Sequence, residues 1–186
     1  MSIPRICLAA VALGATACAS TGGWQGAAAE RTYDQNLEAI RATAVLNNDD
    51  YYEIHQDGRI YVLADAGDLK LFLENGEIPL RVTRIGGGPK GETVVFGIAR
   101  PESRKKDGFG AVEMFDGRRK GSDKNFYAEI FADNQYYVFG DWASLVSFRK
   151  GQPGSLSQVG SGPKGEPVLA TEPALLGKFR TLHAAR

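Results

Sequence analysis

The sequence of 186 residues contains only two cysteines and two histidines. Zinc, haem and iron–sulfur sites are built mainly from these two residue types, so we predict no metal site and no cofactor. Basic and acidic residues balance at 22 each, and the chain lacks the excess positive charge that a nucleic-acid partner requires. No apolar run approaches the length of a bilayer span, so we expect no transmembrane helix in the mature chain.

The remaining composition is that of a folded protein. Hydrophobic residues make up 43% of the chain and charged residues 24%, which is typical of a globular protein and not of a disordered one. The 23 glycines, together with 7 tyrosines and 9 phenylalanines, favour β structure with many turns. The length allows one domain or two small ones.

The first 17 residues have the pattern of a secretory signal peptide. Met1 to Arg5 is short and positively charged, Ile6 to Ala15 is apolar, and Ala15-Thr16-Ala17 is a cleavage site made of small residues. The apolar segment is too short to remain in a bilayer. We therefore predict export of the chain, with removal of residues 1–17.

Cys18 follows this cleavage site directly. Ala15-Thr16-Ala17-Cys18 resembles the lipobox of bacterial lipoproteins, in which the cysteine is diacylated and becomes the first residue. That resemblance implies lipidation of Cys18 and, with Ala19 next to it, a place in the outer membrane with the polypeptide in the periplasm. The alternative is an ordinary cleavage site, before Cys18 or after Ala29, which leaves a soluble periplasmic or secreted protein.

The folded body contains no cysteine under either reading. Cys7 leaves with the signal peptide and Cys18 lies at the mature N-terminus, so no disulfide stabilises the fold. Residues 18–30 are mainly small and polar and predict a flexible tether. A helix is expected within residues 31–50, over Tyr33 to Leu46, because its apolar residues fall on one face.

The body contains an internal repeat. Residues 53–73 align on residues 129–149 without gaps, and residues 85–95 align on residues 159–169. The longest shared motif is Gly-x-Gly-Pro-Lys-Gly-Glu-x-Val, at 86–94 and again at 160–168. The other identical pairs are Glu53/Glu129, Ile54/Ile130, Asp57/Asp133, Tyr61/Tyr137, Val62/Val138, Asp65/Asp141, Leu69/Leu145 and Phe72/Phe148.

Each repeat predicts the same small unit. In the first copy two β-rich runs flank Asp57-Gly58, a pair suited to a type I′ hairpin turn. A helix should follow, capped by Asp65, with Leu69, Phe72 and Leu73 on its apolar face and a stop at Gly76. Residues 80–86 and 92–98 form the second hairpin, with its turn at residues 88–91.

We therefore expect an α+β fold, a tandem duplication of a ββαββ unit packed as one pseudo-symmetric body. The units are residues 51–100 and residues 126–186, the second with a C-terminal helix over Ala174 to His183. Residues 101–125 form a basic connector that contains a strand over Ala111 to Phe115. A unit of this size buries too little surface alone, so the copies should pack face to face or edge to edge.

The repeated Gly-Pro-Lys-Gly-Glu turn supplies the candidate binding residues Lys90, Glu92, Lys164 and Glu166. Glycine-rich turns expose backbone N–H groups, and the lysines add positive charge, so an anion site is one interpretation. The other is a hairpin turn fixed by backbone geometry, with a salt bridge inside each turn or a pair across the pseudo-axis. The motif is not a P-loop, because no Ser or Thr follows the lysine.

Other polar residues have structural explanations. Asp57 and Asp133 occupy turns, and Asp65 and Asp141 are helix caps, so they predict neither calcium binding nor acid–base catalysis. His55 and His183 are expected at the surface. The basic clusters at 104–106 and 118–120 could contact anionic lipid or an acidic partner, or be solvated loops.

The repeats resemble uncharacterised secreted proteins of Gram-negative bacteria in the segments 57–62 and 88–92, and this resemblance implies no activity. We assign no catalytic residue and expect a non-catalytic periplasmic lipoprotein that acts as a binding or accessory module. One alternative is an accessory subunit of a periplasmic membrane-associated complex, such as a dehydrogenase. Another is an enzyme whose site lies in the groove between the repeats, lined by Lys90, Glu92, Lys164 and Glu166. A protein partner is compatible with each.

Mass spectrometry of the mature protein tests the lipid anchor. We expect an N-terminal cysteine that carries acyl chains, and recovery of the protein in the membrane fraction. Cys18→Ala should release the chain from that fraction, because the acylated side chain is lost. A free Glu30 terminus, or fractionation unchanged by Cys18→Ala, would contradict the prediction.

Overall fold

The computed structural model describes residues 48–152 and 154–184, all within the compact unit Ile40–Arg186. These residues form one mixed eight-stranded sheet, four α-helices and a short 3-10 helix. The expected mixed α+β class is thus confirmed. The predicted signal peptide, Cys18, the tether and the helix at 33–46 lie outside the described residues. None of the helices that the structure describes has the length and apolar character needed to cross a membrane.

Both halves of the described chain have the element order strand, strand, helix, strand, strand, helix, apart from the 3-10 helix. The first half comprises β1 (Asp50–Gln56), β2 (Arg59–Leu63), α2 (Ala66–Asn75), β3 (Arg81–Arg84), β4 (Thr93–Gly97), the 3-10 helix η1 (Arg100–Glu102) and α3 (Gly110–Phe115). The second half comprises β5 (Tyr127–Ala132), β6 (Gln135–Phe139), α4 (Trp142–Arg149), β7 (Ser157–Ser161), β8 (Pro167–Ala170) and α5 (Leu175–Leu182).

The turns and caps follow from local sequence. Asp57 and Gly58 join β1 to β2 with φ angles of 52° and 71°, the left-handed values of a type I′ turn. The Asp65 carboxylate accepts the backbone N–H of Gly67 at 2.8 Å and so begins α2. Asp141 caps α4 in the same way. The predicted hairpin turns and N-caps are therefore confirmed.

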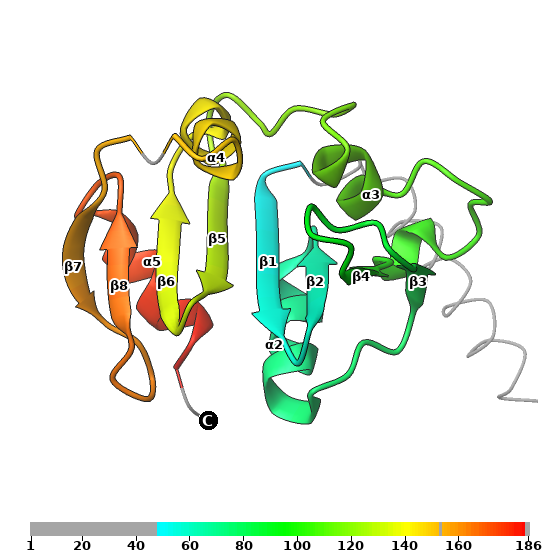
Figure 1. Cartoon of the computed structure of the whole chain (residues 1–186), viewed down its shortest axis with the longest axis horizontal. Coiled ribbons are helices and arrows are strands. Elements are labelled where there is room, and N and C mark those ends of the chain that lie inside the picture. The colour runs from blue at the N-terminus through cyan, green and yellow to red at the C-terminus, as the bar shows by residue number, and fades with distance from the viewer. Residues whose placement is uncertain (1–47, 153, 185–186) are drawn as a thin grey trace, which may run out of the picture. The chain divides into compact units, whose positions relative to one another are not determined.

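The two halves join edge to edge through their first strands. The strand order is β3-β4-β2-β1-β5-β6-β8-β7, and β1 pairs with β5 in parallel (Figure 1). Each half is built outward from this junction in the same sequence: first strand, second strand, fourth strand, third strand. The two halves therefore pack edge to edge, which is one of the two arrangements expected from the sequence, and not face to face.

The register at the junction sends aligned residues to opposite faces of the sheet. Tyr51 pairs with Ala128 and Glu53 with Ile130, whereas Tyr127 aligns with Tyr51 in the sequence. Paired residues of neighbouring strands point to the same face, and successive residues alternate between faces. Tyr51 and Glu53 therefore face one side, called face A, and their aligned residues Tyr127 and Glu129 face the other side, face B.

Two hydrophobic cores result, one on each face. On face A, α3 and α4 cover the sheet through Ala111, Met114 and Leu145. On face B, α2 and α5 cover it through Leu69, Phe72 and Phe179; Figure 1 shows α5 behind β6 and β8. Each core thus combines strands and helices from both halves. Neither half completes a core alone, as its small size requires.

The connector contains more structure than expected. Residues Ala111 to Phe115, predicted as a strand, belong to helix α3. The buried residues of α3 include Ala111 and Met114, three positions apart, and this spacing is that of a helix face and not of an alternating strand. The Glu102 carboxylate accepts the N–H of Gly110 at 3.0 Å, which satisfies a free donor at the helix start. The prediction of a strand was wrong because a short apolar run does not distinguish a strand from a helix. Glu102, which accepts the N–H at the helix start, lies eight positions earlier in the sequence.

The C-cap of α2 provides a stability test. Gly76 has φ of 71°, so Gly76→Ala should lower the free energy of unfolding by about 1–2 kcal/mol because a side chain disfavours this conformation. Gly177 lies inside α5 with open space around it, and Gly177→Ala should raise stability by up to about 1 kcal/mol. Urea unfolding measures both. Equal effects of the two substitutions would contradict the assigned conformations.

Candidate functional site

Two clefts open on opposite faces of the sheet, near the junction of β1 and β5. Cleft A, on face A, has a volume of about 570 Å³ and is lined by Glu53, His55, Pro89, Phe115, Phe148 and Arg149, among others. Cleft B, on face B, has a volume of about 660 Å³ and its lining includes Ile54, Leu73, Glu129, Tyr136, Lys164 and His183. Both volumes lie in the range of sites for small molecules.

A buried glutamate with a tyrosine partner lies at the base of each cleft. Glu53 is 5% exposed, and the Tyr51 hydroxyl donates a hydrogen bond of 2.5 Å to its Oε2. Glu129 is 1% exposed, and the Tyr127 hydroxyl donates one of 2.9 Å to its Oε2. Tyrosine and glutamate are two residues apart in each strand, and this spacing brings them to the same face.

Each glutamate also has a histidine partner, but from different elements. Glu53 Oε1 lies 2.7 Å from Nε2 of His55, on the same strand. Glu129 Oε1 lies 2.9 Å from Nε2 of His183, which follows α5. The residue that aligns with His55 is Phe131, so the second half obtains its histidine from the C-terminal helix. His183, expected at the surface, has a side chain only 3% exposed; that prediction was wrong.

Arg149 adds a third partner in cleft A alone. Its Nε lies 3.3 Å from Glu53 Oε2, and its Nη1 donates to the Phe115 carbonyl at 2.9 Å. The guanidinium carbon lies 4.4 Å from the centre of the Phe115 ring and 5.8 Å from that of Tyr51. These contacts hold a planar cation between a carboxylate and two aromatic rings. In cleft B the aligned residue is Leu73, which is 44% exposed.

The protonation states follow from these contacts. Burial opposes ionisation of Glu53, but the hydrogen bond to His55, the charge of Arg149 and the hydroxyl of Tyr51 outweigh it and hold the pKa below its ordinary 4.5. Burial and the neighbouring carboxylate raise the pKa of Tyr51 well above 10. Burial, followed by Glu129, likewise raises the pKa of Tyr127. The tyrosines therefore remain neutral donors to their glutamates.

The turn residues predicted for binding do not share a cleft. Lys164 and Glu166 line cleft B, whereas the equivalent turn contributes Gly87, Gly88 and Pro89 to cleft A. Within each turn the glutamate accepts the backbone N–H of the lysine, at 2.8 Å in both cases. In the first turn, the Glu92 carboxylate accepts hydrogen bonds from its own backbone N–H and from that of Lys90. These two bonds, in that order of size, lower the pKa of Glu92. The two glutamates therefore brace the turns, which accounts for their recurrence.

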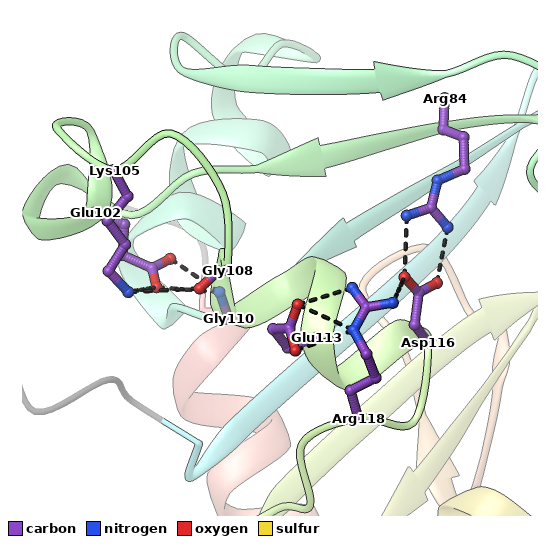
Figure 2. A network of polar contacts seen from close by, with 8 residues as sticks. All are labelled: Arg84, Glu102, Lys105, Gly108, Gly110, Glu113, Asp116 and Arg118. Carbon is purple, nitrogen blue, oxygen red and sulfur yellow. Dashed lines mark hydrogen bonds and ion pairs between the residues drawn. The ribbon is translucent and has the colours of Figure 1, made fainter.

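Two basic residues of the connector, Lys105 and Arg118, form internal ion pairs (Figure 2). Arg118 contacts Glu113 and Asp116, each at 2.7 Å, and Asp116 also accepts two hydrogen bonds from Arg84. Lys105 lies 3.1 Å from Glu102. Among the described residues, no group of three or more His, Cys, Asp or Glu is arranged to hold a metal ion. The two buried glutamates and their partners are thus among the polar groups that line the clefts.

The sequence contains a signal for these two glutamates. Glu53 and Glu129 are identical in the repeats, and each lies between apolar neighbours in its strand; Tyr51 and Tyr127 are also identical at the same spacing. A recurring charge in a buried strand indicates a paired, buried group. Arg149 and His183 had no comparable signal. Arg149 aligns with Leu73, and His183 lies outside the aligned segments.

Replacing the carboxylate of Glu53 tests how much it contributes to the stability of the fold. Glu53→Gln should lower the free energy of unfolding at pH 7 by about 1.5–3 kcal/mol, because a neutral amide loses the ion pair with Arg149 and the stronger hydrogen bonding of a carboxylate.

The pH dependence has a defined sign. The folded-state pKa of Glu53 lies below 4.5, so its contribution is present above that pH and is lost as the pH falls through the lowered pKa. The difference between wild type and Glu53→Gln in urea unfolding should therefore shrink below pH 4.5. The exposed Glu77→Gln is the control, with little effect expected at any pH. A difference that does not change with pH would contradict ionised, paired Glu53.

Comparisons of the chain with protein-family models, curated proteins and solved structures found no match.

Proposed function

We propose that the chain is a non-catalytic, lipid-anchored binding module of the bacterial periplasm. Cleft B is the observation that carries the proposal: its volume is about 660 Å³, and its lining includes Ile54, Leu69 and Phe72 from the first half and Tyr136 from the second. A cleft with aromatic and aliphatic walls and a few buried polar groups suits binding and orientation of a small molecule.

Several observations support the non-catalytic part of the proposal. Each buried glutamate accepts a hydrogen bond from a tyrosine and contacts a histidine of the same chain, and these contacts stabilise the fold. The anchor itself rests on the signal peptide and the lipobox-like Cys18. An outer-membrane, periplasm-facing location follows from the same motif.

We further propose that the body is a tandem duplication of a ββαββ unit, packed as one pseudo-symmetric body. Its support is the aligned identities, the shared element order and the mirrored strand order around β1 and β5. The one-residue offset at the junction corresponds to a half turn about the strand direction. That operation would place equivalent clefts on opposite faces.

A neutral fluorescent probe, N-phenyl-1-naphthylamine, tests the binding function. We expect saturable enhancement of its fluorescence, and Leu182→Trp should weaken binding about tenfold or more, a loss of about 1.4 kcal/mol, because the larger side chain fills cleft B. The control Leu80→Trp places the same side chain at a 41% exposed position outside both clefts and should bind normally. Non-saturable enhancement, or equal binding by both variants, would reject the proposal.

Solubilised membranes separate the proposal from an accessory-subunit role. A free module elutes at its own mass after detergent extraction, whereas a subunit of a larger periplasmic complex elutes with that complex.

A further inference from the structure

Glu129 in cleft B has acceptor capacity that its neighbours leave unused. A carboxylate offers about four acceptor positions. Tyr127 donates to one oxygen and His183 contacts the other, while Glu53 in cleft A has a tyrosine, a histidine and an arginine. Glu129 is 1% exposed and lines the cleft, so a ligand in the cleft is the available source of a further donor.

Cleft A indicates what that donor would be. There the third partner is the guanidinium of Arg149, at the end of α4, which packs on Phe115 and forms an ion pair with Glu53. The helices α2 and α4 begin at aligned caps, and Leu73 takes the place of Arg149 along α2. Glu53 in cleft A is therefore paired with a guanidinium of its own chain, and no arginine of the described residues lines cleft B.

The lining of cleft B suits a cation on an apolar stem. The rings of Phe72, Phe131 and Tyr136 are among its walls, and aromatic faces attract a guanidinium. Its ionisable lining comprises His183, the lysines at 70 and 164, and the glutamates at 74, 129 and 166, so carboxylates exceed ammonium groups by one. Glu129 is the least exposed of these glutamates, at 1% against 7% for Glu166.

We propose that cleft B binds a small molecule with a guanidinium group on an apolar stem, with Glu129 accepting its N–H groups. This assignment rests on the proposed binding function of the chain and names the ligand chemistry of the same cleft. Leu73 keeps the place of the internal arginine open, and Glu129 determines the preference for a cation.

Calorimetric titration with 4-phenylbutylguanidinium and its neutral analogue 4-phenylbutylurea tests the proposal. All proteins carry Cys18→Ser, which keeps acyl chains and detergent out of the titration. We expect the guanidinium to bind at least tenfold more tightly than the urea, with one site per chain. In Glu129→Gln the two compounds should bind equally; a preference that survives this change would overturn the role of Glu129.

Two arginine variants of α2 provide a matched pair. Leu73→Arg should abolish guanidinium binding, because the new side chain takes the position at Glu129 that Arg149 takes at Glu53. Leu71→Arg adds the same charge at a 40% exposed position outside the cleft and should bind as wild type. Binding that persists in Leu73→Arg, or is lost in both variants, would overturn the proposal. Circular dichroism checks that each variant is folded.

Failure of this inference is distinguishable from failure of the binding function. If the neutral fluorescent probe binds in cleft B but the guanidinium shows no advantage over the urea, the cleft binds apolar molecules and the cation preference is wrong. If neither probe nor guanidinium binds, the binding function itself is rejected.

Discussion

The parallel pairing of β1 with β5 is the constraint on which the other features depend. The pairing is offset so that Glu53 lies opposite Ile130 and not opposite its aligned residue Glu129. Two aligned glutamates side by side on one face would repel each other in a buried setting. The offset sends them to opposite faces, and each face then receives one helix from either half. The two cores, the two clefts and the separation of the buried charges all follow from this register.

Burying a carboxylate is costly unless charged and hydrogen-bonding partners compensate it. In this chain the cost is met in two ways: on face A by a tyrosine, a histidine and an arginine, and on face B by a tyrosine and a histidine alone. The partners beyond the tyrosines are not repeated: His55 and Arg149 align with Phe131 and Leu73, and His183 lies outside the aligned segments. The local unit recurs, but its charge compensation is assembled separately on each face.

Local features were predictable from the sequence, whereas features that depend on distant contacts were not. The Asp57-Gly58 turn and the Asp65 cap depend on residues within three positions of each other, and the sequence contains all of them. The helix at Ala111 to Phe115 is stabilised from outside by Glu102, and His183 is buried by contact with Glu129, 54 positions earlier. Alternation in a strand does not indicate which of its two sets of side chains points to which face of the sheet. The register between β1 and β5, and therefore the position of the clefts, could not be predicted from the sequence.

The placement of the clefts on opposite faces has a consequence for how the chain can change. A sheet with cores on both sides insulates the two linings, since adjacent residues of β1 such as Glu53 and Ile54 contribute to different clefts. A substitution that reshapes one lining leaves the other in place. The fold therefore holds two clefts whose linings can vary independently of each other.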